Sequence, residues 1–370
     1  MSSNSHNLNK KRVLVAMSGG VDSSVAIAKL IDEGYEAIGI TLKLWETKDP
    51  TTNKNKASNC NSIEAINGAK MVCDRLGVHH YTLDHIETFR KSVVEDFKEQ
   101  YLSGRTPNPC VRCNSEVKWG TLIEQANRMG AYYISTGHYA RIENKDNEYV
   151  LKKGLDISKD QSYMLWKVDK EHLKRTLLPI GKMKKKEVRE YAEKIQLETS
   201  AAPESQDLCF VMEGDYRRFL HEAMPDIISD MSEGDITDED GNKIGNHSGF
   251  INYTIGQRRG LGLSFPTPRY VKKINPISNQ VMVAEKKSIY SNRCFSNNIN
   301  WLIDKPETPL KARAKIRYNS DDSSVEVESV NNRYRFTFEE PQLAITPGQS
   351  VAIYNKDILI GGGIIESYDE

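Results

Sequence analysis

A short apolar run that ends in a glycine- and serine-rich turn sets the strongest limit on the fold of this chain. Residues 13–17 read Val-Leu-Val-Ala-Met, and residues 18–24 read Ser-Gly-Gly-Val-Asp-Ser-Ser. A β-branched run followed by such a turn and by helix-compatible residues predicts a strand–loop–helix unit. Gly19 and Gly20 let backbone N–H groups approach an anion, and the helix points its positive end at the same place. The unit therefore favours a phosphate site.

The same turn excludes two common kinds of nucleotide loop. It has neither the G-x-x-x-x-G-K-[ST] pattern nor the G-x-G-x-x-G pattern. Asp22 would repel an anion unless it also holds a metal or caps the loop. That combination suits pyrophosphate bound with Mg²⁺ better than simple hydrolysis of a γ-phosphate. A Gly-Ser turn opening an ordinary helix stays open as the alternative.

Composition and charge narrow the class of protein. The chain has 370 residues, enough for two or three domains, and 51 basic residues balance 51 acidic ones. Residues 182–189 are locally basic and residues 213–240 are acidic. No apolar stretch reaches membrane-spanning length, and the polar first residues lack a secretory signal. Six cysteines without such a signal predict reduced thiols in a cytoplasmic protein.

The order of apolar segments predicts the fold. Strand-like and helix-like segments alternate over the first two hundred residues, which favours a doubly wound parallel sheet of the α/β class. Strands are expected at 13–16, 37–42, 79–83 and 132–136, and helices at 21–33, 62–76, 89–101 and 119–129. From about residue 271, short alternating strands predict a small antiparallel barrel. We expect domains at 1–212, 213–275 and 276–370.

Two segments carry the thiols of greatest interest. Residues 106–114 read Thr-Pro-Asn-Pro-Cys-Val-Arg-Cys-Asn, a proline-stiffened loop that ends in Cys110 and Cys113. Cys209 lies in a second loop-like segment, Pro-Glu-Ser-Gln-Asp-Leu-Cys-Phe, at residues 203–210. A redox dithiol, a metal site with three thiolates, and a persulfide carrier with a resolving thiol are all compatible with this pattern. Cys60, Cys73 and Cys294 have no comparable neighbourhood.

Together these segments resemble the bacterial tRNA-specific 2-thiouridylases, a family of ATP pyrophosphatases with a PP-loop. The resemblance covers nearly the whole chain after residue 11. Its markers are residues 18–24, 106–114, 136–141 (Thr-Gly-His-Tyr-Ala-Arg), 159–163 (Lys-Asp-Gln-Ser-Tyr), 205–210 and 252–260. It implies an ATP-pyrophosphatase domain, a central tRNA-binding or linker domain, and a C-terminal β-barrel. The implied reaction is 2-thiolation of the wobble uridine in tRNAs for lysine, glutamate and glutamine.

The resemblance also implies roles for individual residues. Cys113 would be the nucleophile and Cys209 would carry a persulfide. ATP would be bound, together with Mg²⁺, by Ala16, Met17, Ser18, Gly19, Gly20, Val21, Asp22, Ser23, Leu42 and Gly137. The target base or the tRNA would be contacted by Asn108, Pro109, Cys110, Lys159, Asp160, Gln161, Arg317 and Tyr318. No resident metal ligand is implied, and the sulfur would come from a persulfide carrier protein or a cysteine desulfurase.

One departure keeps an alternative open. Some relatives have Asp where Cys110 stands, and a thiol cannot be equated with that carboxylate. Cys110, Cys113 and Cys209 could instead hold a [4Fe–4S] cluster in an iron–sulfur tRNA thiolase. A small-molecule synthetase that shares the phosphate loop would leave both cysteine segments without a use. An RNA-binding protein without catalysis would leave the phosphate loop without one.

Overall fold

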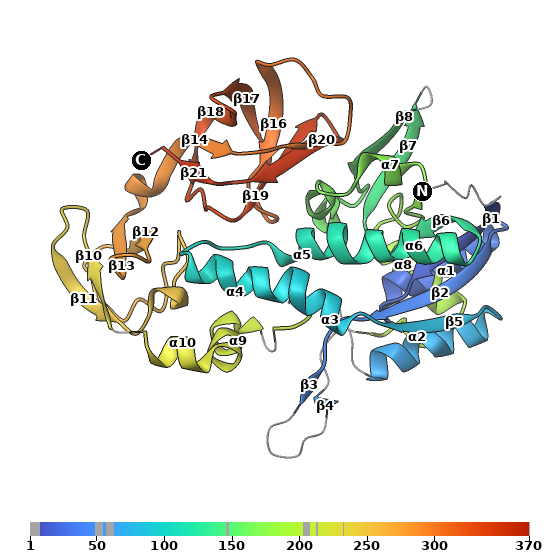
Figure 1. Ribbon diagram of the computed structural model, residues 1–370. Coiled ribbons are helices and arrows are strands. Elements are labelled where there is room, and N and C mark those ends of the chain that lie inside the picture. The colour runs from blue at the N-terminus through green and yellow to red at the C-terminus, as the bar shows by residue number, and fades with distance from the viewer. Residues whose placement is uncertain are drawn as a thin grey trace, which may run out of the picture. The chain divides into compact units, whose positions relative to one another are not determined.

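A computed structural model describes residues 8–48, 55–56, 63–145, 148–202, 208–211, 214–231 and 233–369. The chain divides into two compact units (Figure 1). The first comprises Met1–Val93, Cys110–Gly214 and Asp357–Ile360, and the second comprises Val94–Pro109, Asp215–Lys356 and Gly361–Glu370. Within the described part of the chain, no helix is both long enough and apolar enough to span a membrane.

The first unit is built on the parallel sheet that the sequence predicts. Its strand order is β5-β2-β1-β6-β9, and every recorded pair in it is parallel. The strands are β1 (Asn9–Ala16), β2 (Glu36–Lys43), β5 (His80–Asp84), β6 (Ala131–Ser135) and β9 (Thr176–Leu177). The helices that accompany them are α1 (Val21–Asp32), α2 (Ile63–Arg75), α3 (Ile86–Phe89), α5 (Pro109–Arg112), α6 (Gly120–Arg128), α7 (Lys170–Leu173) and, after β9, α8 (Lys185–Lys194).

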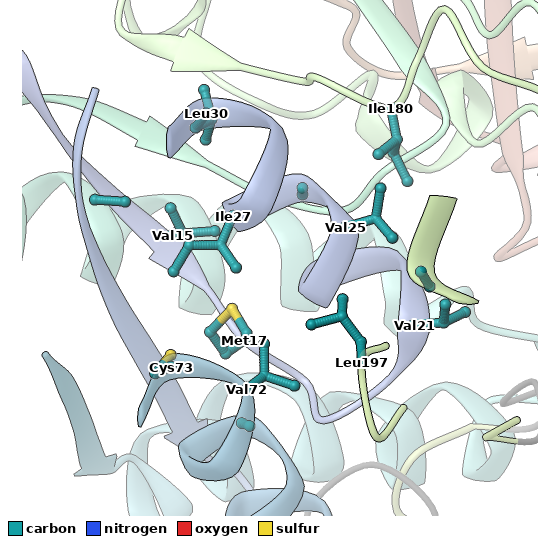
Figure 2. Close-up of a cluster of buried hydrophobic side chains, with 14 of the residues drawn as sticks. Val15, Met17, Val21, Val25, Ile27, Leu30, Val72, Cys73, Ile180 and Leu197 are labelled. Carbon is teal, nitrogen blue, oxygen red and sulfur yellow. The ribbon is translucent and has the colours of Figure 1, made fainter. Parts of the chain in front are cut away.

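Helices cover both faces of this sheet. Val13, Val15 and Met17 of one β1 face belong to a buried cluster with side chains from α1, α2 and α8. Figure 2 shows Val15 beside Ile27 of α1, and Met17 beside Val72 of α2. Helix α6 contacts β1 and β6 and adds no residue to that cluster, which places it on the opposite face. Alternate side chains of β1 therefore pack into the hydrophobic cores on the two opposite faces of the sheet, as a doubly wound fold requires.

Two shorter features of this unit were not predicted from the sequence. An antiparallel hairpin, β7 (Ala140–Lys145) and β8 (Glu148–Lys153), follows the parallel strand β6, and the start of β20 (Ile358–Ile364) pairs with β8. Strands β3 (Thr47–Lys48) and β4 (Asn55–Lys56) form a second small pair. Cys60 and the segment 203–207 lie outside the described residues.

The second unit contains antiparallel strands, as the alternating pattern predicts for this part of the chain. Four of them lie at predicted positions: β16 (Leu310–Lys315), β17 (Ser323–Val330), β18 (Arg333–Leu343) and β19 (Ser350–Asn355). Three others were not predicted: β14 (Tyr290–Ser296), β15 (Asn300–Trp301), which pairs with β20, and β21 (Ser367–Tyr368). A separate sheet has the order β11-β10-β13-β12. Its strands are β10 (Gly234–Thr237), β11 (Lys243–His247), β12 (Arg269–Asn275) and β13 (Gln280–Glu285), and helices α4 (Glu95–Leu102), α9 (Tyr216–Ala223) and α10 (Pro225–Ser229) belong to the same unit.

Candidate active site

The predicted phosphate loop follows β1 at the carboxyl edge of the parallel sheet. Gly19 has a φ of +77°, and a Cβ atom there would lie 2.2 Å from the carbonyl oxygen of Ala65. The hydroxyls of Ser23 and Ser24 both donate to the carbonyl oxygen of Gly20, at 3.1 and 2.9 Å. Gly20 itself provides no side-chain cap for α1. The first-turn N–H groups of this twelve-residue helix therefore suit an anion.

Residues at the ends of two neighbouring strands lie at the same edge of the sheet as this loop. β2 and β6 flank β1 in the sheet, and Leu42 lies near the end of β2 with 8% of its surface exposed. Gly137 follows β6, and a Cβ atom there would lie 2.7 Å from the backbone nitrogen of Ser23. The structure thus brings Leu42, Gly137 and the loop to one edge, as parallel strands do. Their binding of ATP remains a prediction.

Asp22 has a partner that the sequence did not reveal. Both of its carboxylate oxygens lie 2.8 Å from the Nζ of Lys185, and the hydroxyl of Tyr139 donates to its Oδ1 at 2.7 Å. Asp22 therefore needs neither a metal nor a capping role to offset its charge in this conformation. Lys185 lies in the locally basic run at residues 182–189, and its ammonium pairs with Asp22 of the phosphate loop. The sequence does not distinguish Lys185 from its neighbours Lys184 and Lys186.

The two clustered thiols lie in a helix, and the prediction of a loop for them is wrong. Helix α5 begins at Pro109, and η2 (Cys113–Trp119) and α6 continue it without interruption. Proline is well suited to a first helical position because its fixed φ is helical and its missing N–H would have no partner there. Cys110 and Cys113 therefore lie one turn apart, Cys110 half-buried and Cys113 only 5% exposed.

Cys113 opens a stretch of π-helix, and its neighbour Asn114 is buried. The Nδ2 of Asn114 donates to the carbonyl oxygen of Met164 at 3.0 Å, which ties the helix to the segment after residue 159. The Oδ1 of Asn114 accepts no hydrogen bond from any residue that the structure describes. A buried acceptor left in this state costs about 1–3 kcal/mol. π-Helical turns and unsatisfied buried groups both occur preferentially at functional sites.

Aromatic packing brings the Cys209 segment to the same region of the first unit. Phe210 is buried, and its ring lies 5.7 Å from that of Phe89 and 6.1 Å from that of Trp45. Phe89 ends α3, which also contacts η2. Cys209 and Cys113 thus lie on segments that share one packing partner. No disulfide joins the cysteines of the described residues.

The donor groups do not converge into a metal centre. Within the described ranges, no three or more His, Cys, Asp or Glu side chains are grouped so that they could hold a metal ion. Cys110, Cys113 and Cys209 all lie within those ranges. The three thiolates that a [4Fe–4S] cluster requires are therefore not gathered in this conformation.

The residues expected to bind tRNA are distributed over both units. In the first unit, Lys159 is half-buried, Gln161 accepts a hydrogen bond from the backbone of Tyr139, and Asp160 is 5% exposed. The carboxylate of Asp160 accepts hydrogen bonds from Gly154 and from the backbone and hydroxyl of Ser162. Asp160 therefore supports the local structure. Its direct contact with tRNA stays a prediction.

In the second unit, the turn at residues 344–349 organises the remaining candidates. The Nε2 of Gln349 donates to the carbonyl oxygens of Thr106 and Pro107, which fixes the chain just before Asn108 and Pro109. The guanidinium of Arg317 donates to Ala344 and Thr346. The Nζ of Lys315 lies 5.7 Å from the ring of Tyr318. The exposed basic residues include Arg258, Arg259 and Lys273.

His138 lies beside Thr136 and Trp119 in the first unit, and its pKa reports how far its ring is shielded from water. Its Nδ1 lies 2.7 Å from the hydroxyl of Thr136, and its ring lies 5.5 Å from that of Trp119. Burial, and to a smaller extent the charge of Lys118, lowers the pKa of His138 from its ordinary value of 6.5 to about 3. The ring is therefore neutral at neutral pH, which fits a structural hydrogen-bonding residue.

This low pKa predicts a pH-dependent loss of stability. Between pH 6.5 and about pH 3 the unfolded chain binds a proton at His138 that the folded chain does not. The free energy of unfolding is therefore undiminished by this group above pH 6.5 and decreases as the pH falls towards about pH 3. We expect His138→Gln to reduce the drop in melting temperature between about pH 7.5 and about pH 5. The exposed His221→Gln is the matched control, and an equal effect of both variants in calorimetry would contradict the assignment.

The fold and the glycine–serine loop together define a nucleotide-binding α/β domain, and comparisons with known proteins agree. Residues 11–213 match the tRNA methyl transferase HUP domain model. Residues 219–285 match the tRNA methyl transferase PRC-barrel domain, and residues 291–365 match the aminomethyltransferase beta-barrel domain. These three matches follow one another along nearly the whole chain.

Individual relatives identify the family. The tRNA-specific 2-thiouridylase MnmA of Carboxydothermus hydrogenoformans is 43% identical, over 97% of this chain and 98% of its own length. MnmA 1 of Caldanaerobacter subterraneus subsp. tengcongensis is 46% identical over 96% and 98%. MnmA of Acetivibrio thermocellus is 42% identical over 97% and 100%. The chain belongs to the family of the tRNA-specific 2-thiouridylases.

Proposed function

We propose that this protein is an ATP-dependent tRNA-uridine 2-sulfurtransferase, which replaces the C2 oxygen of a wobble uridine with sulfur. Two contacts within the first unit carry the proposal. Gly137 approaches the phosphate loop, and α3 contacts both η2, which begins at Cys113, and Phe210, which follows Cys209. Family membership supports the same reaction. A bacterial cytoplasm is the expected location, and tRNAs for lysine, glutamate and glutamine are the expected substrates.

Activation of the base is the first step. A ring carbonyl oxygen is a poor leaving group, so the uracil O2 attacks the α-phosphorus of ATP and pyrophosphate departs. The loop formed by residues 18–23, with Leu42 and Gly137, would hold the nucleotide, and its N–H groups would stabilise negative charge on the departing pyrophosphate. Mg²⁺, when bound, would supply further charge neutralisation on the phosphates. The base then carries AMP as a good leaving group.

Sulfur transfer follows at the cysteines. The terminal sulfur of a Cys209 persulfide attacks C2, and AMP leaves. The Cys113 thiolate then attacks the Sγ of Cys209, which breaks the sulfur–sulfur bond to the substrate, releases the 2-thiouridine and leaves a Cys113–Cys209 disulfide. In this exchange the Cys113 sulfur is oxidised and the transferred sulfur is reduced, while the Cys209 sulfur keeps its oxidation state. An external dithiol reduces the disulfide to two thiolates, and a sulfur-carrier protein or cysteine desulfurase renews the persulfide. Cys113 could alternatively release hydrosulfide first, with the same products.

The division of labour along the chain forms part of the proposal. We assign catalysis to residues 1–212, a tRNA-binding or linker role to residues 213–275, and a further RNA-contacting role to residues 276–370. Asn108, Pro109 and Cys110 would face the target base, and Arg317, Tyr318 and Lys159 would contact the tRNA. Contacts with phosphates would make the affinity for tRNA decrease with salt.

One experiment tests the reaction and its principal alternative together. Protein purified without oxygen is analysed for iron and acid-labile sulfide and assayed for ATP-dependent thiolation of unmodified tRNA. We expect 2-thiouridine, AMP and pyrophosphate to form in equal amounts without iron. Activity that rises in proportion to about four irons per chain would instead make Cys110, Cys113 and Cys209 cluster ligands. Absence of thiolation by both the iron-free and the iron-containing protein would contradict the proposed function.

A further inference from the structure

Lys185 forms an ion pair with a residue of the phosphate loop, and the geometry of this pair is well defined. Its Nζ lies 2.8 Å from both carboxylate oxygens of Asp22, a residue in the first turn of α1. Its side chain is only 12% exposed, against 33% for Asp22. The ammonium also lies 5.7 Å from the centre of the Tyr139 ring, whose hydroxyl donates to the same carboxylate. Asp22 is thus held from two directions.

The surroundings fix Lys185 in this position. It is the first residue of α8, and its backbone N–H donates to Asp156 at 2.9 Å. One turn further, Val188 is buried in the cluster that also contains Val21 and Val25 of α1. Helices α1 and α8 are in contact. This packing holds the start of α8 against α1, the helix that follows the phosphate loop.

The neighbouring lysine differs in each of these respects. The side chain of Lys186 is 86% exposed, and its Nζ lies 3.6 Å from Glu190 on the same helix. Lys184 and Lys182 are exposed as well. An exposed ion pair such as Lys186–Glu190 contributes little to the stability of the fold. The basic run therefore contains one inward-facing lysine among outward-facing ones, and Lys186 is its natural control.

Charge explains why the inward lysine matters. A carboxylate in the first turn of α1 opposes the field that makes the helix end attractive to phosphate. A polyphosphate brought to the loop would meet this negative charge at close range, where screening by water is weak. The ammonium of Lys185 removes that repulsion.

Resting on the proposed function, we propose that Lys185 is a positioning residue for nucleotide binding. It acts through Asp22: its ammonium neutralises the negative charge of the carboxylate and fixes the orientation of that group. The pyrophosphate portion of ATP can then enter the loop. Lys185 thus serves the nucleotide, and the tRNA phosphates are left to the exposed lysines around it.

The test measures binding of inorganic pyrophosphate and of ATP, with and without Mg²⁺, by titration calorimetry on the full chain. We expect Lys185→Met to lower the affinity for both ligands by about tenfold or more. Lys186→Met should change these affinities by less than about twofold. Lys185→Arg keeps the charge and should restore most of the affinity. Melting temperatures measured in parallel identify any variant that is unfolded.

The decisive comparison repeats the Lys185→Met change in a chain that carries Asp22→Asn. Because Lys185 acts through the carboxylate, its removal from the Asp22→Asn chain should lower the affinity for pyrophosphate without Mg²⁺ by less than about threefold. An undiminished effect in the Asp22→Asn chain would overturn the proposal and make Lys185 a direct phosphate ligand. Equal binding by Lys185→Met and the unaltered chain would overturn it too. Absence of binding of either ligand by the unaltered chain would refute the proposed function itself.

Discussion

Changing Cys113 or Cys209 to Ser should reduce formation of 2-thiouridine to the background of the assay while ATP binding is retained. A serine hydroxyl neither carries a sulfane sulfur nor resolves a persulfide, so each variant removes a bond-forming atom and not merely a contact. The phosphate loop lies on another segment of the first unit and should be unaffected. Mass spectrometry of nucleosides from the treated tRNA measures the thiolation, and calorimetry measures ATP binding.

Cys294→Ser is the matched control for loss of a thiol. Cys294 is fully buried on β14 in the second unit, and burial raises the pKa of its thiol well above the ordinary value. We expect a lower melting temperature with thiolation retained. The Cys110→Ser variant separates an accessory thiol from an essential one. Retained thiolation in Cys113→Ser or in Cys209→Ser would contradict the proposed roles of these two cysteines.

Gly19→Ala should weaken ATP binding by more than about tenfold and thereby suppress thiolation, because two costs coincide at this position. The φ of +77° is unfavourable for a residue with a side chain, and the added Cβ atom would lie 2.2 Å from the backbone oxygen of Ala65. That contact can be relieved only if the loop or the start of α2 moves. Binding of ATP to the purified variant, measured by calorimetry, checks this expectation.

Gly34→Ala distinguishes the collision from the backbone strain. Gly34 follows α1 with a φ of +84°, and a Cβ atom there would meet nothing within 4 Å. This control should lose stability by a similar backbone cost, about 1 kcal/mol, and bind ATP normally. Comparable ATP affinity in Gly19→Ala and Gly34→Ala would show that the loop tolerates the displacement, contrary to the proposed site.

Local patterns were sufficient for most of the secondary structure. The β-branched run before Ser18 and the glycines after it predict β1, the loop and α1, because side-chain alternation and backbone freedom act over a few residues. The alternating segments beyond residue 276 predict the antiparallel strands for the same reason. The cysteine helix is the clear exception. Two prolines indicated a loop, but Pro109 stands at a first helical position, where proline is favoured.

Candidate chemical groups could also be selected from the sequence. Cys113, Cys209 and the phosphate loop stand out because each lies within a short, unusual motif, and the roles that the family resemblance implies for them remain predictions. Leu42 and Gly137 came from the family resemblance, and their position at the same edge as the loop agrees with the rule that parallel strands end at one edge of the sheet. The order of the strands was found only in the structure.

The partners of the charged and buried polar groups required the tertiary structure. Lys185 is separated from Asp22 by 163 residues, and nothing in a run of lysines distinguishes the one that turns inward. Asn114 meets Met164 across 50 residues, and its unsatisfied oxygen is a property of packing alone. Motifs and periodicity act over a few neighbouring residues and could therefore be recognised in the chain as written. Which distant charges face one another is settled only when helices such as α1 and α8 pack, since that packing determines which side chains lose contact with water.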